Sequence, residues 1–241
     1  MRVLGVVTAR GGSKGIPKKN LCLLAEIPLL QYTAEAARAA SGLTRVILST
    51  DDPEIAEAGR RLGFDVPFLR PVELARDDTP SIPVIQHAVR YLQRCADAYD
   101  AVFVLQPTNP LRRPADIDGP IKLLQRTGAD SVISVTDVGH HHPARMKIVN
   151  LDGRVTNPPF AEEYEGQPRQ LLPKFYLRDG SVYLTRTDVL IEQNSLAGDH
   201  CQAWIVPRER ACSIDTPWDL LLAEQILARQ ARPAYEADGI A

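Results

Sequence analysis

The residues whose types and spacing best suit ligand binding or catalysis lie in a basic, glycine-rich segment near the start of the chain. Residues 9–20 read Ala-Arg-Gly-Gly-Ser-Lys-Gly-Ile-Pro-Lys-Lys-Asn and include the cations Arg10, Lys14, Lys18 and Lys19. Glycines let a backbone approach a ligand and turn its N–H groups toward phosphate oxygens, and the cations can neutralise a triphosphate and a departing pyrophosphate. The spacing fits neither the Walker A phosphate loop, GxxxxGK[ST], nor the dinucleotide-binding fingerprint, GxGxxG. It therefore predicts a phosphate loop of another kind, with a flexible basic surface loop as the alternative.

A second candidate for chemistry, Asp215, lies near the end of the sequence. It follows the apolar Ile214 and precedes Thr216-Pro217, where a helix can begin, so its carboxylate can lie at the end of a strand. A hard divalent cation on such a carboxylate bridges phosphate oxygens. Asp215 is therefore the candidate ligand for Mg²⁺ or Mn²⁺, and a turn residue without metal is the alternative.

Strand and helix signals alternate through the first half of the chain. The apolar run 3–7 is typical of a strand buried on both faces. The same reasoning predicts strands at 45–49, 66–69, 101–105 and 131–135, and helices at 28–42, 53–63, 81–95 and 114–126. This alternation predicts an α/β fold with a mostly parallel sheet and helices on both faces. Ligands of such sheets bind at the carboxyl ends of the strands, where segment 9–20 begins.

The pattern changes after residue 135. Residues 146–155, with Asp152-Gly153 in the middle, predict a hairpin, and residues 157–175 are rich in proline, glutamine and charge. Strand signals return at 181–184 and 203–206, and a helix is expected from Pro217, with Thr216 and Asp219 at capping-box spacing. We interpret residues 137–178 as an insertion into a single domain, 1–241, that carries acceptor contacts, a dimer interface, or both.

Composition and charge exclude several classes of protein. The net charge is −2 and no block of lysine and arginine stands out, so no nucleic-acid partner is expected. No apolar run approaches the ~20 residues that span a bilayer, and the N-terminus lacks a signal-peptide pattern. The four cysteines show no metal or redox spacing. We expect a cytoplasmic protein with reduced, buried thiols and no membrane partner.

Segment 9–20 closely resembles the signature of the acylneuraminate cytidylyltransferases, the CMP-sialic acid synthetases. Further similar segments follow in the same order along the chain, from residue 9 to residue 220. They are Leu-Ser-Thr-Asp at 48–51, Arg-Pro-Val-Glu-Leu-Ala at 70–75, Leu-Gln-Pro-Thr-Asn-Pro-Leu-Arg at 105–112, Pro-Arg-Gln and Leu-Pro within 168–173, and Ile-Asp-Thr-Pro with Asp-Leu within 214–220.

The resemblance implies a Rossmann-like nucleotidyltransferase that moves CMP from CTP to a small acidic acceptor, a nonulosonate such as a sialic acid. It also implies a homodimer whose insertion reaches the partner's active site. The nucleotide-binding residues it implies are Ala9, Arg10, Gly11, Gly12, Ser13, Lys14, Lys19, Asn20 and Ser81. The catalytic residues are Arg10, Lys14, Lys19 and Asp215, and the acceptor-binding residues are Gln106, Thr108, Arg169, Gln170 and Arg178.

Two departures from the family pattern keep alternatives open. Ser213 stands where the family has a second acid, two residues before Asp215, and Arg178 is displaced by one position from the family's cation. In a strand, one step reverses the face that a side chain occupies. An enzyme acting on a small phosphonate is therefore one alternative. Another is a non-catalytic nucleotide-binding protein, which the retained phosphate loop and Asp215 disfavour.

Other polar and aromatic residues are better explained structurally. Residues His140 to His142 do not have metal-ligand spacing, because neighbours in an extended chain face opposite sides. Asp52 is expected to cap a helix, and Asp77-Asp78 to form a solvated turn. Trp204 and Trp218 are expected in the core or in an interface.

Overall fold

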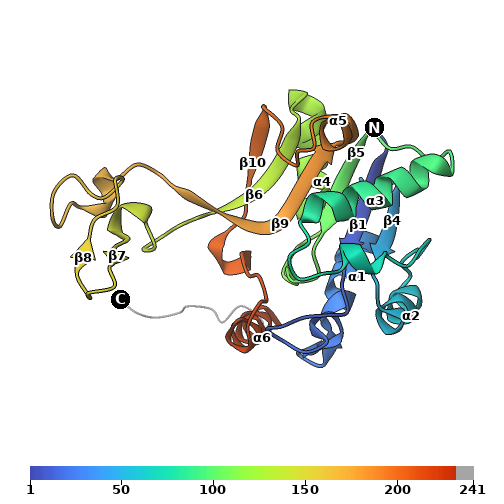
Figure 1. Cartoon of the computed structure of the whole chain (residues 1–241), viewed down its shortest axis with the longest axis horizontal. Helices are drawn as coiled ribbons and strands as arrows, with labels where there is room; N and C mark the ends of the chain where they lie inside the picture. Colours follow the sequence, from blue (N-terminus) through green and yellow to red (C-terminus); the bar gives the residue numbers. More distant parts are fainter. Residues whose placement is uncertain (232–241) are drawn as a thin grey trace, which may run out of the picture.

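A six-stranded, mostly parallel sheet forms the centre of the computed structural model, which describes residues 1–231 (Figure 1). Its order is β10-β6-β9-β5-β1-β4. Neighbours β4, β1 and β5 run parallel, as do β6 and β10, and only β9 is antiparallel to both of its neighbours. The predicted sheet is thus confirmed. The strands are Val3–Thr8 (β1), Arg45–Ser49 (β4), Ala101–Leu105 (β5), Ser131–Asp137 (β6), Tyr176–Arg186 (β9) and Cys201–Ile205 (β10).

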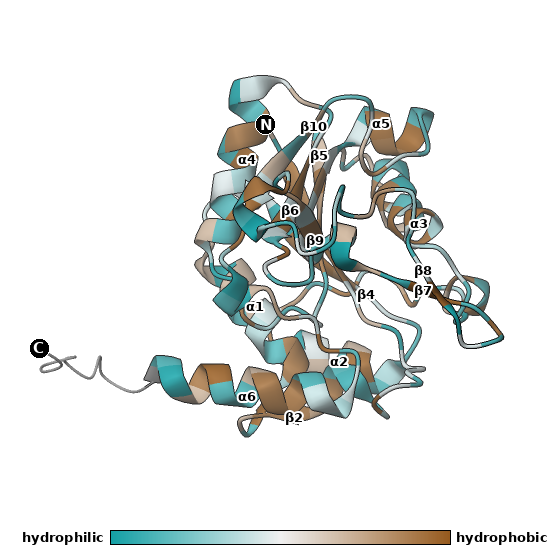
Figure 2. Cartoon of the chain, turned by 90° about the vertical axis from the view of Figure 1, so that its left-hand side faces the viewer, coloured by the Kyte–Doolittle hydropathy of each residue, from teal (hydrophilic) through white to brown (hydrophobic). Residues whose placement is uncertain are grey.

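Helices cover both faces of this sheet, as predicted. Figure 2 shows α1 and α4 on one side of the strands and α3 and α5 on the other. Side chains of α1, α2 and α4 share one apolar cluster with the sheet, and those of α3 and α5 share a second. The helices are Leu29–Ala39 (α1), Pro53–Arg61 (α2), Ser81–Arg94 (α3), Ala115–Thr127 (α4), Thr187–Glu192 (α5) and Pro217–Ala231 (α6).

Local capping signals fix two of the helix starts. Asp52 accepts hydrogen bonds from the N–H groups of Glu54 (2.7 Å) and Ile55 (3.2 Å), which confirms its role as the cap of α2. The Asp219 carboxylate accepts from the Thr216 N–H (2.7 Å), and the Asp219 N–H donates to the Thr216 hydroxyl (3.3 Å). The capping box before α6 is therefore confirmed.

The predicted strand at residues 66–69 is wrong. The chain makes only an isolated bridge between Asp65 and Ile47 of the edge strand β4. Pro67 lacks the N–H that a continuing ladder would require, which accounts for the early end of pairing. The expectation of buried thiols is also only partly right, because Cys95 and Cys201 are exposed while Cys212 is buried, and all four cysteines are free.

Residues 137–178, hereafter the arm, project from the sheet (Figure 1). The ends of β6 and β9 form its stalk, where Asp137 pairs with Tyr176. The predicted hairpin is confirmed as β7 (Ile148–Val149) and β8 (Val155–Thr156), with Gly153 at φ 82° in the turn. His142 is buried at the arm's base, where Nε2 lies 2.9 Å from the Pro173 carbonyl and Nδ1 accepts from the Ala144 N–H, so its role is structural.

The C-terminal helix α6 packs against the segment that follows β1. A third apolar cluster joins Ile16, the small hairpin β2 (Leu23–Leu24) and β3 (Ile27–Pro28), Ile214 and the inner face of α6. This packing places α6 beside the segment that follows β1. Within residues 1–231, no helix has the length and apolar character needed to cross a membrane.

Candidate active site

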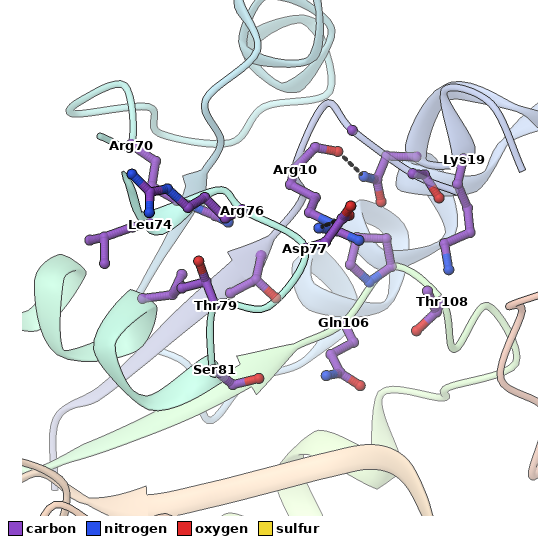
Figure 3. Close-up of a pocket in the computed structure, with 16 residues that line it drawn as sticks. Arg10, Lys19, Arg70, Leu74, Arg76, Asp77, Thr79, Ser81, Gln106 and Thr108 are labelled. Carbon is purple, nitrogen blue, oxygen red and sulfur yellow. Dashed lines mark hydrogen bonds and ion pairs between the residues drawn. The ribbon is translucent and has the colours of Figure 1, made fainter. Parts of the chain in front are cut away.

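A pocket of about 230 Å³ opens at the carboxyl ends of β1 and β5, as the sheet argument predicts (Figure 3). Thr8 ends β1, Gln106 follows β5, and Ser81 begins α3. Segment 9–20 and the connection between β4 and α3 supply the other walls. Of the predicted site residues, the lining contains Arg10, Gly12, Ser13, Lys19, Asn20, Ser81, Gln106 and Thr108.

Segment 9–20 is held in place by its own backbone groups. The Ala9 N–H donates to the Ser49 carbonyl (3.1 Å), and the Gly11 N–H donates to the Asp51 carboxylate (3.1 Å). The amides of residues 9 and 11 are thus bonded within the protein, which leaves ligand contacts to the rest of the loop. A Cβ at Gly11 would lie 2.6 Å from the Asp52 carboxylate, so glycine is required there.

Asn20 closes the loop and explains its shape. Its side-chain amide donates to the Arg10 carbonyl (2.9 Å), a bond drawn as a dashed line in Figure 3, and the side chain is buried. The preceding Lys18 adopts a left-handed conformation (φ 49°) and pairs with Glu54 (2.6 Å). This turn separates the two adjacent lysines, because Lys18 is engaged by Glu54 while Lys19 lines the pocket.

Lys19 and Asp215 form an ion pair at the rim of the pocket. The Lys19 ammonium lies 2.8 Å from one Asp215 oxygen, and the Ser213 hydroxyl donates to the other at 3.2 Å. The Lys19 side chain is only 16% exposed, whereas that of Asp215 is 67% exposed and accessible to a ligand. Gly15 permits this approach, since a Cβ there would lie 2.2 Å from the Asp215 carbonyl oxygen.

The other two predicted phosphate-binding cations share one carboxylate. Asp77 pairs with Arg10 through one oxygen and with Lys14 through the other, both at 2.7 Å. Hydrogen bonds from Lys14 first, and also from Arg10, lower the pKa of Asp77 below its usual value. Residues 77 and 78 form an exposed turn before α3, as predicted, and Asp77 in addition pairs with two cations. No sequence signal links Asp77 to cations more than sixty positions earlier.

Two buried arginines support the pocket, and sequence reasoning assigned neither a role. Arg70 donates from Nε to the Ser49 hydroxyl (3.1 Å) and lines the cavity, while burial lowers its pKa to about 10. Arg112 donates to the carbonyls of Ser181 (2.8 Å) and Gln106 (2.9 Å), and burial lowers its pKa to about 10 as well. Arg70 and Arg112 belong to the motifs at 70–75 and 105–112, which were the sequence signal for a role at the site. Charged side chains are seldom buried unless they are paired.

Arg112 lies behind the predicted acceptor residues and fixes the end of β5. Its Nη1 is buried and has no hydrogen-bond partner within residues 1–231. Asn109 assists by donating to the Asp179 carbonyl (3.1 Å). Gly180, at φ 85°, leaves space beside the Gln106 side chain, where a Cβ would lie 3.2 Å from Oε1. A positive charge thus lies close to the backbone that presents Gln106.

The structure does not bring three of the predicted acceptor residues to this pocket. Arg169 and Gln170 lie in the arm, around a separate cavity of about 290 Å³, where Arg169 approaches Asp137 at 3.7 Å. Arg178, on β9, lies over the Tyr183 ring at 5.6 Å and is outside the pocket lining. A single chain therefore assembles the basic loop, Ser81, Gln106 and Thr108, but not these three side chains.

The acids near the pocket can be tested for their fit to a divalent cation. Within residues 1–231, no three His, Cys, Asp or Glu side chains cluster with metal-site geometry. Asp215 offers one exposed carboxylate, beside the neutral Ser213 hydroxyl. Mg²⁺ is commonly held by one or two carboxylates together with substrate phosphates and water. The donor set therefore fits Mg²⁺ on Asp215 once phosphate oxygens are present.

Comparisons with known proteins agree with this geometry. The cytidylyltransferase family model matches residues 4–192. The chain is 31% identical over 228 residues to the CMP-N,N'-diacetyllegionaminic acid synthase of Legionella pneumophila, covering 94% of this chain and 97% of the relative. It is 30% identical over 224 residues to the pseudaminic acid cytidylyltransferase of Campylobacter jejuni, covering 93% and 95%.

Two further similarities complete the picture. The chain is 30% identical to the N-acylneuraminate cytidylyltransferase of Escherichia coli over 96% of its own length and 53% of that protein. Its fold resembles the structure of a CMP:2-keto-3-deoxy-manno-octonic acid synthetase complexed with CTP, with a TM-score of 0.72 and 20% identity, covering 95% of this chain and all of the other. The fold and family expected from the motifs are confirmed: this chain belongs to the cytidylyltransferase family.

Proposed function

We propose that the protein transfers CMP from CTP to the hydroxyl of a nonulosonate sugar and releases pyrophosphate. The observation that carries this proposal is a pocket lined by Arg10 and Lys19, with Lys14 paired to Asp77 of its lining and Asp215 paired to Lys19. Relatives named for legionaminic, pseudaminic and N-acylneuraminic acids support the acceptor class. No observation favours a phosphonate acceptor or a non-catalytic role.

The proposed reaction needs charge neutralisation more than covalent chemistry. The acceptor hydroxyl attacks the α-phosphorus of CTP, and the bond to the β-phosphate oxygen breaks as pyrophosphate leaves. Arg10, Lys14 and Lys19 would neutralise the charge that builds on the departing phosphates. Ser81 and Asn20 both line the pocket and would contact the nucleotide.

Mg²⁺, or Mn²⁺ in its place, is the proposed cofactor, and Asp215 would hold it. When bound, the cation would polarise phosphate oxygens and orient the triphosphate. Lys19, already 2.8 Å from the same carboxylate, would hold Asp215 beside the pocket. Gln106 and Thr108, at the end of β5, would meet the acceptor, with the buried Arg112 charge favouring an anionic one.

Arg169 and Gln170 reach an active site in this proposal only through a second copy of the chain. The arm holds them away from the pocket of their own chain and exposes many apolar side chains, among them Val149, Leu151 and Phe160. Large exposed apolar surfaces mark interaction sites. A homodimer in which each arm reaches the partner's pocket would bury this surface and supply both residues.

Nucleotide and acceptor choice provide the direct test of the proposed function. We expect the rate of pyrophosphate release with CTP to be well above the rates with ATP, GTP or UTP, because the chain belongs to a family of cytidylyltransferases. With CTP fixed, a panel of nonulosonates, octulosonates and phosphonates should give the highest kcat/KM for a nonulosonate. Equal rates with a purine triphosphate, or a phosphonate as the best acceptor, would refute the corresponding part of the proposal.

Removal of the arm tests the dimer. Asp137 and Tyr176 are paired antiparallel neighbours, so an Asn-Gly turn can replace residues 138–175 and close β6 onto β9. We expect the wild type to be a dimer by light scattering at micromolar concentration and the shortened chain to be a monomer without transferase activity. CTP binding should persist, because the described pocket lining lies outside the arm. A monomeric wild type would contradict this arrangement.

A further inference from the structure

Asp77 contacts the two basic side chains proposed to bind phosphate, although it belongs to a different segment of the chain. Its carboxylate places one oxygen on Arg10 and the other on Lys14, each at 2.7 Å, and it lines the same pocket. Figure 3 shows Asp77 beside Arg10 in the middle of the pocket. We propose that Asp77 occupies the position of a phosphate group in the nucleotide-free enzyme and competes with pyrophosphate for these cations. The proposal rests on the proposed phosphate-binding role of the 9–20 loop.

The geometry of the contact resembles phosphate binding. A phosphate presents two or more charged oxygens to neighbouring donors, and a carboxylate that bridges a guanidinium and an ammonium does the same. No other acid within residues 1–231 forms an ion pair with Arg10 or Lys14. Both cations are therefore paired with one group, which a triphosphate would have to replace.

This pairing can be displaced at little cost. The Asp77 side chain is 45% exposed and that of Lys14 is 79% exposed, and ion pairs in such surroundings are worth little because water screens them. The carboxylate lies between a short 3-10 helix, Val72–Leu74, and the start of α3, outside any regular element. A bound triphosphate, which carries more charge than one carboxylate, would win the competition.

The competition has a consequence for the end of the reaction. An aspartate is ionised at neutral pH, and Lys14 and Arg10 lower the pKa of Asp77 further while they pair with it, so the carboxylate is available to return. When CMP has moved to the acceptor, pyrophosphate remains on the loop. Asp77 would then form its ion pairs with Arg10 and Lys14 again as pyrophosphate departs. This competition would weaken the binding of pyrophosphate and favour its release.

Binding of inorganic pyrophosphate to the full-length enzyme at fixed Mg²⁺ tests this role. Asp77→Asn preserves size and removes the competing charge, so calorimetry should show about tenfold tighter binding of pyrophosphate, in keeping with two exposed ion pairs. The inhibition constant of pyrophosphate in the forward reaction should fall by a similar factor. Asp77→Glu, which retains the charge, should behave like the wild type.

The neighbouring Asp78→Asn is the matched control, because it makes the same change in net charge and forms no ion pair within residues 1–231. It should alter pyrophosphate affinity less than about twofold, as expected for a screened charge. Unchanged or weaker binding by Asp77→Asn would overturn the proposal. Arg10→Ala separates this outcome from failure of the underlying site. If Arg10→Ala leaves pyrophosphate binding intact, the loop is not the phosphate site. If it weakens binding, the loop is the phosphate site and only the role of Asp77 is refuted.

Discussion

Asp215→Asn is expected to lower kcat/KM by about 10³-fold or more at any practical Mg²⁺ concentration. The substitution preserves shape and removes the negative charge that a hard cation requires. Metal stabilisation of phosphoryl charge is worth several kcal/mol, and each ~1.4 kcal/mol is a factor of ten in rate. The effect should be large because Asp215 is the exposed carboxylate beside Lys19, and its neighbour Ser213 offers only a hydroxyl.

A Mg²⁺ titration of the initial rate distinguishes metal binding from a purely structural role. If Asp215 served only to orient Lys19, the asparagine variant would show ordinary Mg²⁺ dependence with a reduced maximum. Ser213→Ala is the matched control, because it removes the 3.2 Å hydrogen bond to Asp215 and leaves the carboxylate. It should change the Mg²⁺ requirement only slightly. Ordinary Mg²⁺ dependence in Asp215→Asn would show that the metal is placed on the wrong residue.

Ser213→Asp extends the same titration in the opposite direction. A second acid beside Asp215 should lower the Mg²⁺ concentration needed for half-maximal rate and leave activity equal or higher. If Ser213 instead faces the acceptor, the new charge should repel an anionic acceptor and raise its KM. The titration is therefore repeated at several acceptor concentrations, so that the two outcomes separate.

Lys19→Ala should lower kcat/KM by at least ~10²-fold, the usual effect of removing one transition-state donor. Lys19 is held near the pocket by its ion pair with Asp215 and by the atoms that bury most of its side chain. Its charge would therefore already be in position when the triphosphate binds. Loss of this ammonium also leaves Asp215 without its cation. Steady-state kinetics with varied CTP measures the effect, and circular dichroism verifies that the fold is intact.

Lys18→Ala provides the control for Lys19, because the two residues are adjacent and carry the same charge. Lys18 pairs with Glu54 on the exposed surface, where ion pairs contribute little. Its removal should change kcat/KM by less than about threefold, since a screened surface charge has a small effect. Comparable losses in both variants would indicate a general electrostatic effect of the loop, and near-normal kinetics of Lys19→Ala would support a simple surface loop.

The sequence predicted those parts of the fold that depend on neighbours along the chain. The buried run at 3–7, the Asp52 cap and the capping box before Pro217 are local patterns, and each is confirmed. The predicted strand at 66–69 does not form because Pro67 interrupts the apolar run and cannot donate to a sheet ladder. Pairing of a strand depends on which partner it meets, and that is decided by the tertiary fold.

The candidate site was predictable where it follows strand ends, and less so where distant segments meet. Position after β1 was enough to place Arg10 and Lys19 at the pocket, and the family resemblance of segment 105–112 added Gln106 and Thr108, which line it as well. The contact of Asp77 with Lys14 depends on how the connection before α3 folds back over the loop, and no periodicity encodes it. Arg169 falls within the insertion that the sequence predicts at 137–178, but spacing alone does not show that the arm holds it around a cavity separate from the pocket of its own chain.

The contact between Lys19 and Asp215 also has a consequence for the order in which the molecule matures. The two residues are separated by 196 positions, and Gly15 allows the Asp215 backbone to lie directly against the loop. During synthesis the phosphate loop emerges early, but its acidic partner follows only after both sheet edges, β4 and β10, have been made. Contacts of such long sequence separation form late because loop closure precedes them. An unfinished chain therefore lacks the Lys19–Asp215 pair, and under the proposed function it would lack the complete triphosphate site.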